Sequence, residues 1–112
     1  MGSCPDRGSS AATPLSLPII LDPEARDEFD RGYDYYEGQR AGLGESFADA
    51  VQAILDPLKS MPQMHRVVFG DIRRAVVHGF PYCVYYREEA ARVRVLSVFH
   101  TKRDPKIWQS RA

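Results

Sequence analysis

A histidine and two arginines in the last third of the chain carry the side chains that phosphate chemistry uses. His100 ends a strand-like run, Arg103 follows it by three residues, and Arg74 lies in an earlier run of β-branched residues. Arginine matches phosphate oxygens with a planar fork of donors, and histidine transfers protons near neutral pH. If the fold brings the three together, they form a candidate phosphate site. Otherwise they are solubilising charges, with Asp104 paired to an arginine.

The same region could instead bind a partner without doing chemistry. Cations and one aromatic residue make up the predicted docking surface, which consists of Arg73, Arg74, Lys102, Arg103 and Trp108. Successive strand residues point to opposite faces, so only one of Arg73 and Arg74 can lie on this surface. The other is expected to snorkel or to form a salt bridge with the helices. The residues after His100 are expected to form a cationic arm that presents Trp108 as an anchor.

Charge is divided along the chain although the formal net charge is zero. The segment 22–56 has ten acidic residues against three arginines, and the segment 57–112 has eleven basic residues against four acidic ones. This division predicts an acidic helical half and a basic half that could bind an acidic partner. Mutual solvation of two faces is the alternative.

Common catalytic and metal-binding patterns are absent from the sequence. There is no phosphate-binding glycine loop, dinucleotide fingerprint or nucleophile elbow. Cys4 and Cys83 have neither disulfide nor metal spacing, and the histidines are scattered, so we predict free thiols, no metal and no cofactor. Acidic residues at 22, 27, 30 and 34 are expected to form a solvated helix face rather than a catalytic pair.

Two helices are predicted in the first half. Asp22 followed by Pro23 is a helix start, with Asp22 as the N-cap, and the first helix is expected to end near Gly38. A second amphipathic stripe begins at Leu43 and continues to position 55, and Pro57 ends or kinks that helix. The short connection predicts an antiparallel hairpin.

Strand patterns occupy the rest of the chain. A short strand is expected at 15–21, with Pro18 placing it at a sheet edge or a bulge. The segment 67–77 could form one bulged strand or two short ones, and strands at 82–87 and 92–99 complete a three-stranded antiparallel meander. The predicted fold class is α+β, with the helical hairpin packed on one sheet face and the first strand joining the sheet.

The chain reads as one domain spanning 14–112, preceded by a polar tail at 1–13 that we predict to be disordered. The sequence has no long apolar run and no basic segment ahead of its short apolar stretch, so we predict neither a membrane span nor a secretory signal. The expected location is the cytoplasm.

Three motifs together are similar to those of a known toxin superfamily. They are Asp71-Ile72-Arg73-Arg74, Phe80-Pro81-Tyr82-Cys83-Val84-Tyr85-Tyr86, and His100-Thr101-Lys102-Arg103-Asp104-Pro105-Lys106-Ile107-Trp108, preceded by Tyr35-Tyr36-Glu37 and Gly42-Leu43-Gly44. The segment from about Leu15 to Arg111 resembles the RelE/ParE superfamily of type II toxin–antitoxin toxins. The resemblance implies a small bacterial toxin, associated with plasmid stabilisation, that a cognate antitoxin protein silences.

The superfamily acts in two ways, and the resemblance implies a choice between them. RelE-like members cut mRNA on the ribosome, a role for which Arg74 and Arg103 would clamp phosphate and His100 would move the proton. ParE-like members inhibit DNA gyrase without cleaving RNA. Cys83, Val76 and Gln109 replace the two cations and the tail tyrosine expected of a nuclease. We therefore favour the ParE-like branch, with the docking surface contacting gyrase, no enzymatic activity, and no DNA binding by this chain alone. The alternative that His100 leaves open is a ribosome-dependent mRNA endoribonuclease.

Antitoxin binding is assigned to apolar residues of the helices, namely Phe29, Tyr33, Tyr36, Phe47 and Val51. These exceed what a small hairpin needs to cover its sheet, so part of them is expected to form a groove for an antitoxin helix. Core packing is the alternative for each residue. A further alternative for the whole chain is an inactive family member that only binds its antitoxin.

Overall fold

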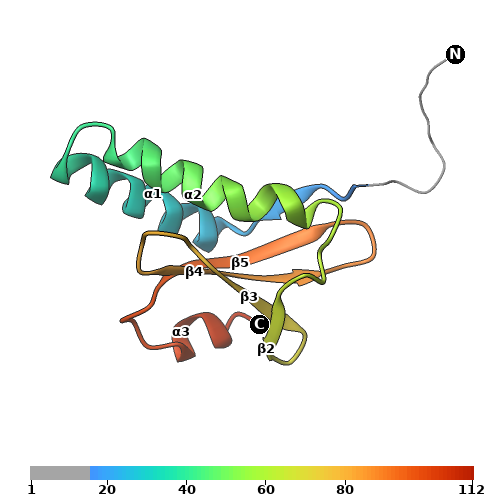
Figure 1. Ribbon diagram of the computed structural model, residues 1–112. Helices are drawn as coiled ribbons and strands as arrows, with labels where there is room; N and C mark the ends of the chain where they lie inside the picture. Colours follow the sequence, from blue (N-terminus) through green and yellow to red (C-terminus); the bar gives the residue numbers. More distant parts are fainter. Residues whose placement is uncertain (1–15) are drawn as a thin grey trace, which may run out of the picture.

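The computed structural model describes residues 16–112 (Figure 1). In chain order the elements are β1 (Ile19–Leu21), α1 (Pro23–Gln39), α2 (Leu43–Leu58), β2 (Arg66–Phe69), β3 (Ile72–Val76), β4 (Tyr82–Glu88), β5 (Val93–His100) and α3 (Lys106–Gln109). The predicted tail at 1–13, with Cys4, lies outside the described residues. None of the described helices is long and apolar enough to cross a membrane.

The strands form one five-stranded mixed sheet in the order β1-β5-β4-β3-β2. Strand β1 pairs in parallel with β5, and every other neighbouring pair is antiparallel. The predicted α+β class and the edge position of the first strand are confirmed. Two strands form in the segment 67–77, around a turn at Gly70 and Asp71, so the antiparallel meander has four strands where we expected three.

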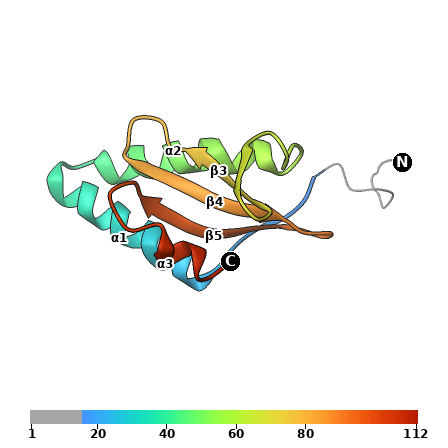
Figure 2. The same ribbon diagram turned by 90° about the horizontal axis from the view of Figure 1, so that it is seen from below.

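Helices α1 and α2 form the predicted antiparallel hairpin and cover one face of the sheet (Figures 1 and 2). The Glu37 carboxylate accepts hydrogen bonds from the N–H groups of Gly42 and Gly44, at 3.1 and 3.0 Å, and so closes the corner at the start of α2. Gly42 has φ of 89°, a left-handed conformation that glycine adopts without strain. A Cβ at Gly44 would lie 3.0 Å from the Tyr33 carbonyl oxygen, so a larger residue there would push α1 and α2 apart at the corner.

The start of α1 differs from the prediction. Helix α1 does begin at Pro23, but the Asp22 side chain makes no capping hydrogen bond. Both Asp22 oxygens instead accept from Arg94 on β5, at 2.9 and 3.0 Å. An ion pair across the sheet edge has replaced the expected local cap. Pro57 lies inside the last turn of α2, which ends at Leu58 as expected.

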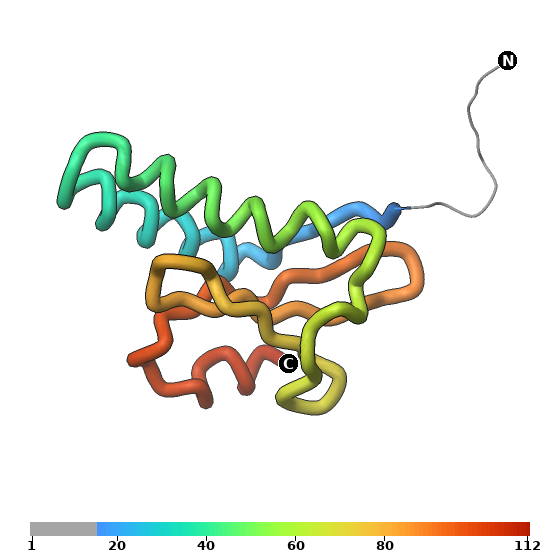
Figure 3. The backbone as a smooth tube through the Cα atoms, in the orientation of Figure 1, coloured from blue at the N-terminus to red at the C-terminus, as the bar shows by residue number. Residues whose placement is uncertain are grey.

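Two apolar clusters lie on opposite faces of the sheet. The larger one fills the space between the hairpin and the sheet and includes Phe47, Leu58 and Tyr86. The smaller one lies on the other face and consists of Ile72, Cys83, Tyr85, Leu96, Phe99 and Trp108. Figure 3 shows the chain after β5 folding back across this second face, so that α3 and the hairpin enclose the sheet from opposite sides.

Candidate functional site

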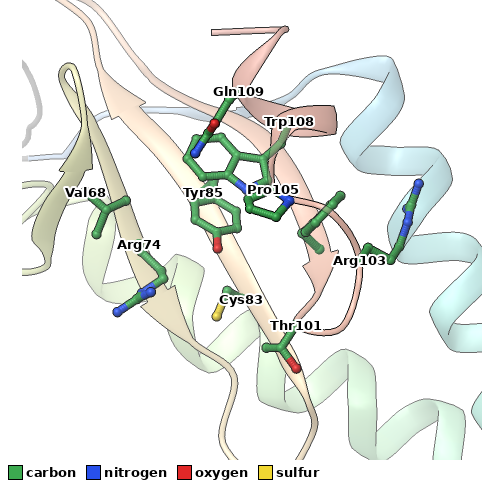
Figure 4. Close-up of a pocket in the computed structure, with 10 residues that line it drawn as sticks. Val68, Arg74, Cys83, Tyr85, Thr101, Arg103, Pro105, Trp108 and Gln109 are labelled. Carbon is green, nitrogen blue, oxygen red and sulfur yellow. The ribbon is translucent and has the colours of Figure 1, made fainter.

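A pocket of about 310 Å³ opens on the sheet face opposite the hairpin, under α3 (Figure 4). Strands β3 and β4 supply one side of the pocket, and the chain after β5 supplies the other. Its lining residues are Val68, Arg74, Cys83, Tyr85, Phe99, Thr101, Arg103, Pro105, Trp108 and Gln109. Arg74, Arg103 and Trp108 of the predicted docking surface therefore share this pocket.

Trp108 forms an aromatic wall of the pocket. Its ring stacks on Tyr85 with centroids 3.9 Å apart and meets the edge of Phe69 at 5.7 Å. Only 2% of the residue is exposed, so the prediction of a projecting anchor is wrong: the arm folds back and buries the indole. The indole N–H has no acceptor among the described residues.

Arg74 is exposed at the rim of the pocket, beside the Tyr85 hydroxyl and the Cys83 thiol. Burial raises the pKa of Cys83, and the nearby Arg74 charge opposes that rise only in part. Burial likewise raises the pKa of Tyr85 above its usual value. Both groups stay protonated at neutral pH, so neither is a ready nucleophile or general base.

Arg103 is held from the opposite side of the pocket. Its guanidinium lies 4.9 Å from the centroid of the Phe99 ring and 3.6 Å from a Glu28 carboxylate oxygen on α1. Figure 4 shows the side chain turned toward α1 and away from Arg74. The two arginines line one pocket without converging on a common point in it.

Glu28 is the residue beside the site that sequence reasoning missed. Its side chain is 5% exposed, and it accepts from the Ser97 hydroxyl at 2.8 Å, the Val98 N–H at 3.2 Å and Arg111 at 3.2 Å. Strand β1 pairs with β5 only from Val93 to Val95. Beyond that point the Glu28 carboxylate accepts the hydrogen bond of the Val98 N–H in place of a neighbouring strand. The available signal was spacing: Glu28 lies three residues after buried Ala25 and four before buried Gly32, on the inward face of α1.

His100 lies outside the main pocket. Its ring meets Tyr82 edge to face at 5.1 Å, and its Nδ1 accepts the Lys102 N–H at 3.1 Å. It lines a separate cavity of about 100 Å³ together with Glu28, Arg31, Tyr82, Val98 and Arg103. Arg103 therefore borders both cavities, whereas His100 and Arg74 do not share one. Lys102 is exposed in the turn after β5.

Arg73 lies on the other sheet face from Arg74, as strand alternation predicts. It donates to the carbonyl oxygens of His65 at 2.7 Å and Gln63 at 3.3 Å, and so holds the chain that enters β2. Of its two expected roles, a salt bridge to the helices does not form among the described residues, and Arg73 does not join Arg74 on a docking surface.

Next to the hydrogen bonds of Arg73, the His65 ring packs edge to face against Tyr86 with centroids 6.1 Å apart. Burial lowers the pKa of His65 below its usual 6.5. The unfolded chain then binds a proton more readily than the folded one, so stability is full above about pH 6.5 and falls as the pH drops toward the folded-state pKa. Urea midpoints between about pH 8 and pH 5 should fall less steeply in His65→Phe. An unchanged slope in His65→Phe would contradict the assignment.

The residues predicted to bind an antitoxin separate into two groups. Phe47 and Val51 are 0% and 3% exposed and belong to the core. Val51 still lines a cavity on the hairpin, whereas Phe47 lines neither of the two described there. The prediction that Phe47 offers a free surface is therefore wrong. Tyr36 is half-buried and packs inward on Phe80, with centroids 4.8 Å apart.

Phe29 and Tyr33 do border hollows on the outer side of the hairpin. A cavity of about 170 Å³ is lined by Leu21, Arg26, Phe29, Ala48, Val51, Gln52 and Leu55. The hollow next to it contains Phe29 and Tyr33 with three carboxylates, from Asp30, Asp34 and Glu45. The Tyr33 hydroxyl donates to Glu45 at 2.6 Å, and this hydrogen bond raises the pKa of Tyr33 to about 12. We call this apolar strip with its acidic end the hairpin groove.

Comparisons with known proteins identify the fold and the family. A solved structure described as the chromosomal ParDE toxin–antitoxin system from P. aeruginosa is similar to this chain, with a TM-score of 0.59 and 17% sequence identity. The match covers 80% of this chain and 100% of that one, and at this identity it shows a shared fold. A search of curated proteins finds no match. The family model of the ParE toxin of the type II toxin–antitoxin system parDE matches residues 19–105, and the chain therefore belongs to the ParE toxin family.

Proposed function

We propose that this chain is the toxin of a type II toxin–antitoxin pair and that a helix of the cognate antitoxin silences it by lying in the hairpin groove. The groove offers an apolar floor at Phe29, Val51 and Leu55 with carboxylates at one end. An amphipathic helix fits such a surface when its apolar face meets the floor. Charge complementarity further requires basic residues on that helix opposite Asp30 and Asp34.

The proposed action is binding to DNA gyrase rather than RNA cleavage. The observation that carries this choice is the separation of His100 from Arg74 into different cavities. A nuclease needs a proton carrier and cations around one phosphate. In the main pocket the titratable neighbours of Arg74 are Cys83 and Tyr85, whose raised pKa values keep them protonated. Docking through Arg74, Lys102 and Arg103 requires no such group.

A supercoiling assay tests both parts of the proposal. Purified chain should inhibit gyrase, and equimolar antitoxin should restore supercoiling. The double variant Asp30→Lys/Asp34→Lys should still inhibit gyrase but should need at least about tenfold more antitoxin for relief, because like charges then face each other at the groove. Asp27→Lys, at an exposed position outside the groove, is the matched control and should behave like wild type.

Normal supercoiling at saturating chain would reject gyrase as the target. Codon-phased mRNA cuts that disappear in His100→Ala would then favour the ribosome-dependent alternative, which the shared cavity of His100 and Arg103 makes worth testing. Harmless induction without antitoxin would indicate an inactive family member.

A further inference from the structure

Strands β2 and β3 place two arginines side by side on the pocket face of the sheet. Arg66 is the register partner of Arg74, and directly paired residues of antiparallel strands project from the same face. Both side chains are exposed. Like charges directly opposite each other destabilise a sheet, so this pair has a cost unless an anion binds it.

The other strand arginines have partners within the fold. Arg87 pairs with Asp71 at 2.8 Å and Arg94 with Asp22 at 2.9 Å, whereas Arg73 donates to backbone carbonyls. Among residues 16–112, neither Arg66 nor Arg74 forms an ion pair. Within the described residues the two guanidinium groups therefore lie side by side without a carboxylate partner, and Arg74 has only the Tyr85 hydroxyl and the Cys83 thiol beside it.

This cationic pair adjoins the pocket under α3. The pocket wall combines the stacked rings of Tyr85 and Trp108, and the buried Trp108 N–H has no acceptor among the described residues. Its volume of about 310 Å³ has room for a side chain of a bound partner. A hydrogen-bond acceptor that entered here would meet an aromatic wall with Arg74 at its rim.

The charge balance favours a protein over a nucleic acid as the occupant. Binding a phosphate backbone depends on an excess of cations, whereas this chain has a formal net charge of zero and an acidic first helix. Carboxylates accept two parallel hydrogen bonds from an arginine, so adjacent arginines suit adjacent acidic side chains.

We propose that Arg66 and Arg74, together with the pocket under α3, bind an acidic segment of the protein target. One carboxylate pairs with the two arginines, and a neighbouring side chain enters the pocket. This inference rests on the proposed function in taking the target to be a protein. It adds Arg66 to the contact surface and makes Arg74, rather than the Glu28-bound Arg103, its main cation.

The test is a double charge reversal, Arg66→Glu/Arg74→Glu, compared with Arg40→Glu at an exposed position near the far corner of the hairpin. Binding to purified gyrase should weaken at least about tenfold in the double variant, and wild-type binding should weaken with added salt. Antitoxin affinity and melting temperature should stay at wild-type values, which shows that the variant folds. Arg40→Glu should bind gyrase like wild type.

Growth inhibition separates failure of this inference from failure of the gyrase assignment. If wild-type chain stops growth without binding gyrase, loss of toxicity in the folded double variant still supports the surface for another protein target. Undiminished gyrase binding and toxicity in that variant would overturn the inference. A labelled single-stranded RNA or DNA oligonucleotide provides the last test. If wild-type chain binds it as tightly as it binds gyrase, and the double variant does not bind it, the occupant is a nucleic acid and the inference is overturned.

Discussion

Glu28→Ala should lower the free energy of unfolding by about 3 kcal/mol, because it removes one member of a buried charge network. The largely buried guanidinium of Arg111 would lose the carboxylate that pairs with it. The Ser97 hydroxyl and the Val98 N–H would lose their hydrogen-bond acceptor. Urea denaturation with a two-state fit measures the loss. The same substitution should free Arg103 from its contact with α1.

Two variants make this prediction specific. Glu28→Gln keeps an acceptor for Ser97 and Val98 but removes the charge, so it should cost less, about 1 to 2 kcal/mol. Glu24→Ala, at an exposed position one turn earlier in α1, should change stability by less than about 0.5 kcal/mol. If Glu24→Ala and Glu28→Ala lowered the free energy of unfolding equally, the Glu28 network would not contribute to stability beyond an exposed glutamate.

Trp108→Ala should cost about 3 to 5 kcal/mol, the range for deleting a large buried ring. The ring lies against Tyr85 and Phe69, so its removal opens a cavity between α3 and the sheet. Near-ultraviolet circular dichroism should lose the signal of the only tryptophan, and urea unfolding should shift to lower concentration.

The neighbouring residue provides the control for Trp108. Ile107 is 40% exposed, so Ile107→Ala should cost less than about 1 kcal/mol. Trp108→Phe retains an aromatic ring and should recover part of the loss. A Trp108→Ala variant as stable as wild type would mean that α3 does not hold the arm on the sheet.

Local sequence signals predicted the helices and most strands. Prolines at helix starts, glycines at turns and the spacing of apolar residues each depend on only a few neighbouring residues. Pro23 begins α1 and Leu43 begins α2, as expected. The strand order could not be read in the same way. The parallel pairing of β1 with β5 joins residues more than seventy positions apart, and such contacts depend on the whole fold.

The candidate site was only partly predictable for the same reason. Arg74 and Arg103 line one pocket without converging in it, and the arm folds back and buries Trp108. Asp22 matched a capping pattern, yet Arg94 on a distant strand binds it. Glu28 went unnoticed because charged residues are seldom buried, although its position on the inward face of α1 was readable.

The pairing of β1 with β5 also determines when the hairpin groove can exist during folding. Leu21, which lines the groove, belongs to β1, and β1 has β5 as its sheet neighbour. Such long-range pairings form late, because the chain must first lose the entropy of closing a large loop. The groove is then complete only once β5 has joined the sheet, so an antitoxin that binds there would bind the fully folded chain in preference to a chain whose β1 is unpaired.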